Sequence, residues 1–214
     1  MRRFKENSKL EKRKYRSRLP RKEKKELQKA NKRLIEQYPF LLPRNVWTGK
    51  VPKDYNYLWT RADEFPVGWW NRFGFALCED LKDVLIRNNY LDKFRIAQIK
   101  EKYGSLCLYD FGAPVEWEEH MVAWEYISEY TCINCGAFPV SMRDDGWISP
   151  YCDRCFKKMH FHATPKEIEY MTSGNDQIEE YCTYYVWKNS EKTEIKIDMK
   201  PYYKLIGYDW LKEH

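Results

Sequence analysis

Two Cys-x-x-Cys pairs are the part of this sequence best suited to chemistry. The first pair is Cys132 and Cys135 in "TCINCG", and sixteen residues separate it from Cys152 and Cys155 in "YCDRCF". Four thiolates coordinate a zinc ion tetrahedrally at about 2.3 Å, and each Cys-x-x-Cys turn presents two of them together. The spacing lies within the range of zinc sites. The sequence therefore predicts zinc as a cofactor, with these four cysteines as its ligands.

The residues around the pairs are typical of a treble-clef layout. Gly136 suits the left-handed backbone that a metal-binding turn often needs, and Asp144-Asp145-Gly146 predict a turn between two short extended pieces. The second pair opens a helix-like stretch, whose N-terminal dipole favours thiolate charge. A zinc ribbon, with its second pair on another hairpin turn, is the alternative.

A four-cysteine site leaves no coordination position for water, which favours a structural role over a catalytic one. We expect His160 and His162 to be exposed helix residues, with metal ligation as the alternative reading. The three remaining cysteines lie in apolar patterns and are expected to be small buried side chains. They are Cys78, Cys107 and Cys182.

Enzyme motifs are missing from the sequence. A zinc deaminase needs His-x-Glu before its cysteine pair, but Met-Val-Ala follows His120. A treble-clef nuclease of the HNH type needs a histidine between its cysteine pairs, and residues 136–151 contain none. Phosphate-binding loops, dinucleotide-binding glycines and His-Glu-x-x-His are also absent. We therefore predict that the protein is not an enzyme.

Charge is distributed unevenly along the 214 residues. Residues 1–38 hold 16 basic and 5 acidic residues (+11), and the remainder holds 22 and 27 (−5), which sum to +6. Such a basic arm indicates an anionic partner, often nucleic acid, with a solvated helix as the alternative. We predict nucleic-acid binding by the densest basic stretch: Arg13, Lys14, Arg16, Arg18, Arg21, Lys22, Lys24 and Lys25.

Helices are predicted in three places. The first runs from Pro20 to Pro39, with a thin apolar stripe that docks one edge on the body or on a partner. The second covers 68–88 and the third follows Pro114. Their expected buried faces are, in order, Leu27 and Leu34 with Ala30 and Ile35; Trp70, Phe73, Leu77, Leu81, Val84 and Leu85; and Trp117, Met121, Trp124 and Ile127. The acidic pairs Glu79-Asp80 and Glu118-Glu119 are expected to face solvent.

Two hairpins are predicted around these helices. In 93–112, Phe94, Ile96 and Gln98 alternate with Arg95, Ala97 and Ile99, and Gly104 supplies the turn. Strands near 181–188 and 193–199 flank "NSEK", with two expected buried rows. These rows are Thr183, Tyr185 and Trp187, and Ile195, Ile197 and Met199.

The sequence thus predicts an α+β fold, a mixed helix and hairpin domain with an inserted zinc site. We assign 1–38 to the basic arm, 39–130 to the body, 131–162 to the zinc module and 163–214 to a C-terminal hairpin packed on the body. Hydrophobic residues make up 43% of the chain and aromatics 17%, enough for a core. No apolar run reaches the roughly 20 residues of a membrane span, so we expect a soluble, cytoplasmic protein.

Several stretches resemble small zinc-finger proteins of unknown function encoded by phages and prophages, especially of Gram-positive gut bacteria. They are "YPFLLPRNVWTGKVPKDY", "QIKEKYGSLCLYD" and "TCINCG" with "GWISPYCDRC", and they cover somewhat over half of the chain. An Arg usually occupies the place of Cys107 in that class. The resemblance implies zinc binding by the four paired cysteines and carries no established activity.

Two functions follow as predictions. The first is a non-enzymatic phage accessory protein that associates with DNA or RNA through its basic arm. The alternative is a protein-binding effector that captures a host factor, such as a defence or transcription component. An aromatic surface at Trp47, Trp59 and Trp69 would suit that second role.

Overall fold

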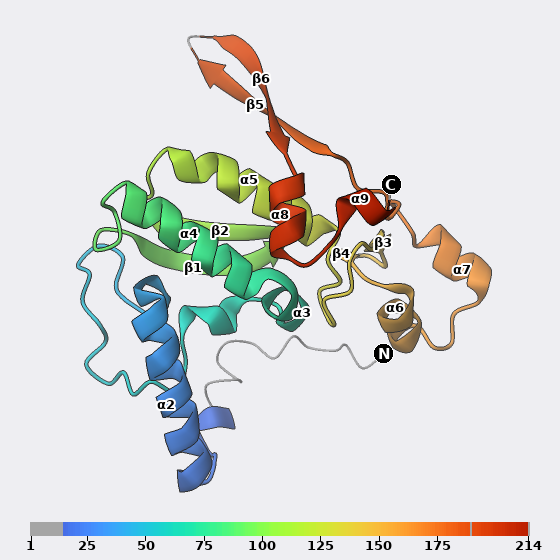
Figure 1. The fold of residues 1–214 in the computed structure, drawn as a ribbon. Coiled ribbons are helices and arrows are strands. Elements are labelled where there is room, and N and C mark those ends of the chain that lie inside the picture. Colours follow the sequence, from blue (N-terminus) through green and yellow to red (C-terminus); the bar gives the residue numbers. More distant parts are fainter. Residues whose placement is uncertain (1–14, 189, 214) are drawn as a thin grey trace.

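The computed structural model describes residues 15–188 and 190–213, so Arg13 and Lys14 lie outside the described residues. Its main helices and strands follow in chain order (Figure 1). They are α2 (Arg21–Gln37), η1 (Pro39–Leu41), η2 (Arg61–Glu64), α3 (Val67–Trp69), η3 (Trp70–Gly74), α4 (Phe75–Arg87), β1 (Arg95–Lys102), β2 (Ser105–Phe111) and α5 (Glu116–Glu129). The second half adds β3 (Met142–Asp144), β4 (Ile148–Pro150), α6 (Asp153–Met159), α7 (Pro165–Tyr170), β5 (Tyr181–Lys188), β6 (Glu191–Asp198), α8 (Lys200–Leu205) and α9 (Trp210–Glu213).

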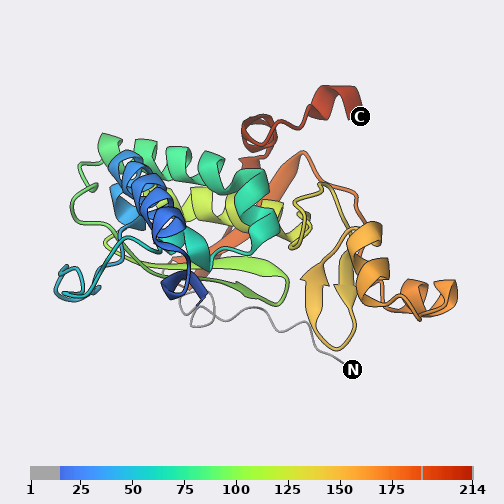
Figure 2. The ribbon, with the colours of Figure 1, turned by 90° about the horizontal axis from the view of Figure 1, so that it is seen from below.

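The fold is α+β, as the sequence predicts, with three separate two-stranded antiparallel sheets. Helix α5 packs on β2, and α4 packs on α5. Both helices lie on the same side of the β1–β2 hairpin (Figure 2). Aromatic residues dominate the core between them, and Trp69, Trp117 and Trp124 are all fully buried. Among the described residues no helix is both long enough and apolar enough to span a membrane.

Helix α2 docks on the body along one edge, as predicted. Leu27, Leu34 and Ile35 are half-buried, whereas Ala30 is exposed. The helix ends at Gln37 because Pro39 cannot continue it. Its outer end projects away from the rest of the molecule (Figure 1).

The helix predicted over 68–88 is interrupted in its first half. A π-helical turn, η3, separates α3 from α4. A π-turn accommodates an extra residue, so the face presented to the core shifts at that point. Trp70 is consequently only half-buried, while its neighbour Trp69 is fully buried. The other five residues of the predicted face are buried as expected.

The β1–β2 hairpin has the predicted turn at Tyr103-Gly104, where both residues have positive φ (55° and 83°). Its register shifts between Ile96 and Gln98, which is a β-bulge. The strict alternation predicted for 94–99 is therefore wrong after the bulge. Ile96 and Ile99 are both buried on the core side, because the extra residue resets the phase of the strand.

In the C-terminal hairpin the predicted buried face of the first strand is wrong for Thr183 and Tyr185, and the side chain of Trp187, the third residue of that row, lies outside the described residues. Thr183 and Tyr185 are exposed, whereas Cys182 is buried and pairs with half-buried Ile197. This two-stranded hairpin extends from the body (Figure 1) and contacts the core mainly at its base. Alternation of residue types along its strands therefore does not determine which face is turned toward the core. Beyond it, Met199 and Tyr203 are fully buried and tie the C-terminal helices to the core.

Candidate functional site

The four paired cysteines come together in space. Their sulfur atoms all lie within 4.8 Å of one another. The first pair occupies the turn after α5, the β3–β4 hairpin follows, and the second pair lies at the start of α6. Turn, hairpin and helix in this order form the predicted treble-clef layout; the zinc-ribbon alternative fails because the second pair is at a helix start.

Backbone hydrogen bonds shape the first pair. The Cys132 amide donates to the Ala137 carbonyl at 2.8 Å, and the Gly136 amide donates back to the Cys132 carbonyl at 2.9 Å. The turn closes through Gly136, whose φ of 78° is the left-handed value expected from the sequence. This compact turn directs both thiols of the pair toward the second pair.

Helix α6 positions the second pair. Cys152 is its N-cap residue, and its sulfur accepts a hydrogen bond from the Cys155 amide at 3.4 Å. The partial positive charge of a helix N-terminus favours negative charge on these sulfurs. Arg143 fixes the helix from the hairpin side, where it is buried, forms an ion pair with Asp153 and lies over the Phe156 ring.

The separation of the sulfurs fits a tetrahedral metal ion. Sulfurs at about 2.3 Å from a common centre lie about 3.8 Å apart in a tetrahedron. The distance between the Cys135 and Cys152 sulfurs is 3.6 Å. Within the described residues, this is the one group of His, Cys, Asp and Glu side chains arranged closely enough to hold a metal ion.

The thiol pKa values within the cluster diverge. Burial acts to raise the pKa of Cys135, but hydrogen bonds from the Ala137 amide and the neighbouring cysteines outweigh it and lower the pKa to about 7. Burial raises the pKa of Cys132 and of Cys155. Arg154 hydrogen-bonds to Cys135, and this bond with the charge of the cluster raises the Arg154 pKa. A lowered thiol pKa at Cys135 thus coincides with a neighbouring cation, Arg154.

The two histidines after the second pair are not part of the cluster. His160 is half-buried rather than exposed, because its Nε2 lies 2.9 Å from the Asp145 carboxylate across the module. His162 is exposed, as predicted. Asp144 and Asp145 form the expected turn, in which their side chains accept from the amides of Gly146 and Trp147.

The module is joined to the body through backbone contacts at α3. The Gly68 amide donates to the Ile133 carbonyl at 2.9 Å, and the Trp69 indole donates to the Thr131 carbonyl at 2.9 Å. These bonds explain why Trp69 is fully buried. The prediction that Trp69 belongs to an exposed aromatic surface is therefore wrong. Trp59 is half-buried, and only Trp47 of that set is exposed, at 79%.

The other cysteines and the acidic pair Glu79-Asp80 of α4 lie outside the metal cluster. Cys78 and Cys182 are buried as expected, and Cys107 is half-buried. Glu79 is exposed, but Asp80 is not the solvent-facing charge that the sequence predicts. Its carboxylate lies 2.9 Å from His120 Nδ1 and accepts a hydrogen bond from the Trp124 indole at 2.8 Å, which links α4 to α5.

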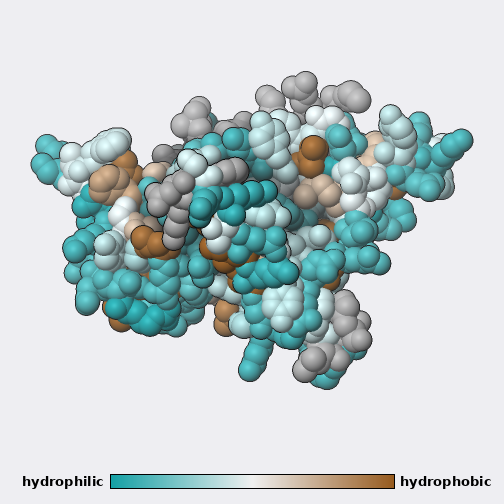
Figure 3. Space-filling model, turned by 90° about the horizontal axis from the view of Figure 1, so that it is seen from above, coloured by the Kyte–Doolittle hydropathy of each residue, from teal (hydrophilic) through white to brown (hydrophobic). Residues whose placement is uncertain are grey.

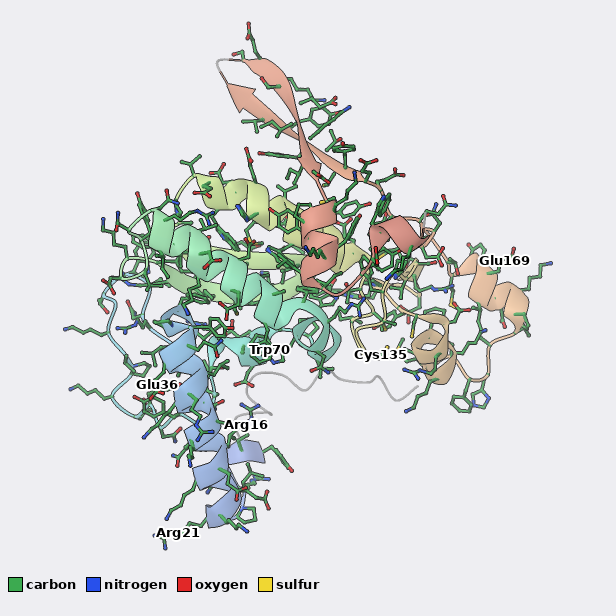
Figure 4. The ribbon with its side chains drawn as sticks, viewed as in Figure 1. Arg16, Arg21, Glu36, Trp70, Cys135 and Glu169 are labelled. Atoms are coloured by element: carbon green, nitrogen blue, oxygen red, sulfur yellow. The ribbon has the colours of Figure 1, made fainter. Side chains whose placement is uncertain are left out.

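Of the eight predicted nucleic-acid-binding residues the structure describes six, which have three different environments. Arg16 is used for docking, because its guanidinium forms a bidentate pair with Asp63 at 2.7 Å and donates to the Leu58 carbonyl. Lys24 is half-buried. The exposed members are Arg18, Arg21, Lys22 and Lys25. Figure 4 places Arg21 at the outer end of α2 and Cys135 in a distant part of the molecule, so arm and cluster are separate features.

The structure adds basic residues that the dense stretch did not include. Lys29, Lys32 and Arg33 are exposed on α2. With Lys22 and Lys25 they recur at intervals of three and four residues, so all five share one face of the helix. Most of that face is turned away from the docked edge, and the Lys32 ammonium lies 5.0 Å from the centre of the Tyr57 ring. The same 3.6-residue period, read for charge rather than for apolar residues, would have identified them from the sequence.

No family model, curated protein or solved structure matches this chain. The resemblance to phage-encoded zinc-finger proteins therefore stays a prediction.

Proposed function

We propose that the protein is a non-enzymatic zinc protein, of the phage accessory kind, that associates with nucleic acid through its N-terminal arm. One observation carries the proposal. Helix α2 presents a row of five exposed basic side chains, here called the basic row: Lys22, Lys25, Lys29, Lys32 and Arg33. In the described part of the chain, no ion pair involves any of them.

The geometry of the basic row suits a phosphate backbone. From Lys22 to Arg33 the row extends about 16 Å along the helix at 1.5 Å per residue. Cations at this density and outside ion pairs attract polyanions because their binding releases condensed counterions. The helix projects from the body (Figure 1), so a long ligand can approach it without contacting the core.

The body contributes rigidity in this proposal. Arg16 fastens the start of the arm to Asp63, and Asn31 donates to the Tyr57 carbonyl at 2.7 Å from the middle of α2. We assign zinc to the four-cysteine cluster, where the closed coordination supports a structural role rather than catalysis. The face of the molecule shown in Figure 3 is mainly hydrophilic, with hydrophobic residues in small separate groups. On that face, the described residues form no broad apolar patch.

The test compares two variants of equal net charge. In the row variant, Lys22, Lys25, Lys29 and Lys32 are replaced by Gln, which preserves helix propensity. In the control, Gln replaces four exposed lysines elsewhere: Lys158, Lys166, Lys192 and Lys204. Fluorescence anisotropy measures the affinity of each protein for labelled duplex DNA and for a labelled single strand over a series of salt concentrations.

We expect the wild-type affinity to fall steeply with salt. The row variant should bind both ligands more weakly, and on duplex DNA its salt slope should be smaller by about 0.9 for each phosphate that the row no longer neutralises. The control should retain most of the affinity and the slope. Equal losses of affinity in both variants would show that binding depends on net charge and not on the basic row. Absent or salt-independent binding by the wild-type protein would refute the proposal.

A further inference from the structure

The outer face of the β1–β2 hairpin has a composition unusual for a sheet surface. Helices α4 and α5 both lie on one side of this hairpin, which leaves its other side uncovered by them (Figure 2). Pairing in the sheet assigns one set of residues to that open side: Arg95, Gln98, Lys100 and Lys102 from β1, and Ser105, Cys107, Tyr109 and Phe111 from β2. The set contains three cations and two aromatic rings. The carboxyl groups of Glu129 and Glu125 on α5 lie beside its Ser105 and Cys107.

The cations and rings on this face are paired. The Lys100 ammonium lies 4.8 Å from the centre of the Tyr109 ring, and the Arg95 guanidinium lies 5.9 Å from the centre of the Phe111 ring. Tyr109 and Phe111 nevertheless remain 43% and 46% exposed. Rings held by neighbouring cations and still open to solvent are suited to stacking with a flat ligand that also carries negative charge.

Trp47 extends this face beyond the strands. It is 79% exposed, and its ring contacts that of Phe111 edge-on at 5.9 Å. The loop that carries it is ordered by Asn45, whose side chain accepts from the amides of Trp47 and Thr48 at 3.0 and 2.8 Å. Arg95 donates to the Val46 carbonyl at 2.8 Å and so joins the loop to β1. The fold therefore fixes a large exposed ring against Phe111, at the end of the strand that also carries Tyr109.

We propose that this face, the hairpin platform of Trp47, Phe111, Tyr109, Arg95 and Lys100, binds single-stranded nucleic acid. Bases stack on the three rings, and the two cations contact phosphates. The proposal deepens the proposed function, on which it depends, by naming the ligand as single-stranded and by adding a second binding surface.

The chemistry of the platform favours a single strand over a duplex. Bases in a duplex are already stacked, so exposed rings on a protein gain little from them, whereas unpaired bases stack freely on aromatic side chains. Residues two apart on a strand, such as Tyr109 and Phe111, lie about 6.8 Å apart. That separation is about twice the 3.4 Å rise per base of a stacked strand. Neighbouring rings can therefore contact successive bases of a strand that is extended to about twice the stacked rise.

The first experiment removes the most exposed ring. Trp47→Ala is compared with Trp47→Phe and with Trp147→Ala, which removes a second exposed tryptophan (63%) at the β3–β4 turn. Anisotropy with labelled oligothymidine and with a duplex of the same length gives the affinities across a salt series. Trp47→Ala should weaken single-strand binding by about fivefold or more, leave the duplex affinity unchanged, and preserve the salt slope. Trp47→Phe should retain most of the affinity and Trp147→Ala all of it.

The outcomes separate this proposal from the preceding one. Tyr109→Leu provides a second test within the strand and should also weaken only the single-strand affinity. If Trp47→Ala and Tyr109→Leu both bind oligothymidine as tightly as the wild-type protein, the hairpin platform is overturned and this face is left for a protein partner. The row variant of α2 then decides the proposed function independently, because it should weaken duplex and single-strand binding alike.

Discussion

The backbones of Gly68 and Gly136 are in direct contact. A Cβ atom on Gly136 would lie 2.7 Å from the Gly68 carbonyl oxygen, and one on Gly68 would lie 2.2 Å from the Cys132 carbonyl oxygen. The first cysteine turn therefore rests on the start of α3 with no side chain between them. Gly136 also has a positive φ, whereas Gly68 does not, so at Gly68 the requirement for glycine is purely one of space.

This contact predicts a steric cost at Gly68. Gly68→Ala should lower the free energy of unfolding by about 1–3 kcal/mol, because the added methyl group forces the cysteine turn away from α3. Urea unfolding followed by tryptophan fluorescence measures the effect. Val67→Ala, at the neighbouring position that is 57% exposed, is the matched control and should change stability little. Equal stability of Gly68→Ala and the wild-type protein would show that the two segments are not in contact.

Loss of one cluster cysteine should remove the metal. Cys135→Ser replaces a soft thiolate with a poor zinc ligand, and a structural zinc site contributes on the order of 10 kcal/mol to folding of its module. We expect the zinc content measured by mass spectrometry to fall from about one ion per chain to well below that, with a lower melting temperature. Cys107→Ser, also at a half-buried cysteine, should retain both values. Full zinc content in Cys135→Ser would contradict the ligand assignment.

The pH dependence of stability should depend on two glutamates of α5. Burial raises the pKa of Glu125 and of Glu129, and each is further affected by a like charge or a hydrogen bond nearby. A carboxyl whose folded pKa exceeds its unfolded pKa binds more protons in the folded state between those two values. Stability from these groups is therefore lost as pH rises through the folded pKa and is recovered as pH falls toward the unfolded one, near about 4.3.

Glu125→Gln should accordingly increase the free energy of unfolding at neutral pH and flatten its fall with rising pH. The gain should disappear near the unfolded pKa, where both proteins carry a neutral side chain. Urea unfolding at a series of pH values measures this difference. Glu118→Gln, in the exposed first turn of the same helix, should cost at most the helix-dipole interaction of about 0.3–1 kcal/mol and should not reproduce the gain at neutral pH. A loss of stability in Glu125→Gln at neutral pH would reverse the assignment.

The Arg16–Asp63 pair should hold the start of the arm on the body. Its bidentate geometry at 2.7 Å and its low exposure (23% and 24%) distinguish it from ordinary surface pairs. Arg16→Gln should expose the chain before α2 to trypsin, and residues 15–20 should lose protection from hydrogen exchange. Arg18→Gln removes a neighbouring exposed arginine and serves as the control. Unchanged cleavage in Arg16→Gln would mean that the arm is held by α2 alone.

Local features of the sequence were sufficient for the metal cluster and for two helices. The Cys-x-x-Cys spacing, Gly136 and the turn at Asp144-Asp145 lie within one short segment, so their chemistry determines the treble-clef layout directly. Helix α5 follows a regular 3.6-residue pattern, and every residue of its predicted face is buried. Helix α2 is bounded by two prolines, which act locally.

Tertiary contacts decided what periodicity could not. One additional residue in the π-turn η3 and one in the bulge after Ile96 shifted the buried face, and a periodic pattern has no means of locating such a shift. Asp80 is half-buried because His120 and Trp124 reach it from a helix about forty residues away. Trp69 is buried because the cysteine turn covers it.

The two proposed binding surfaces show the same division. The net charge of the arm follows from the sequence alone. Which of its cations share an exposed face of α2 depends on which edge of that helix docks on the body. Trp47 lies about sixty residues before Tyr109 and Phe111 in the sequence. It reaches Phe111 only because Arg95, which pairs with Phe111 in the hairpin, also holds the Asn45 loop. The sequence alone determined ligands and periodic faces, because these depend on near neighbours. The fold determined which residues of a helix or strand face the core, which side chains are buried, and which rings from separate segments come into contact. These properties depend on contacts between separate elements.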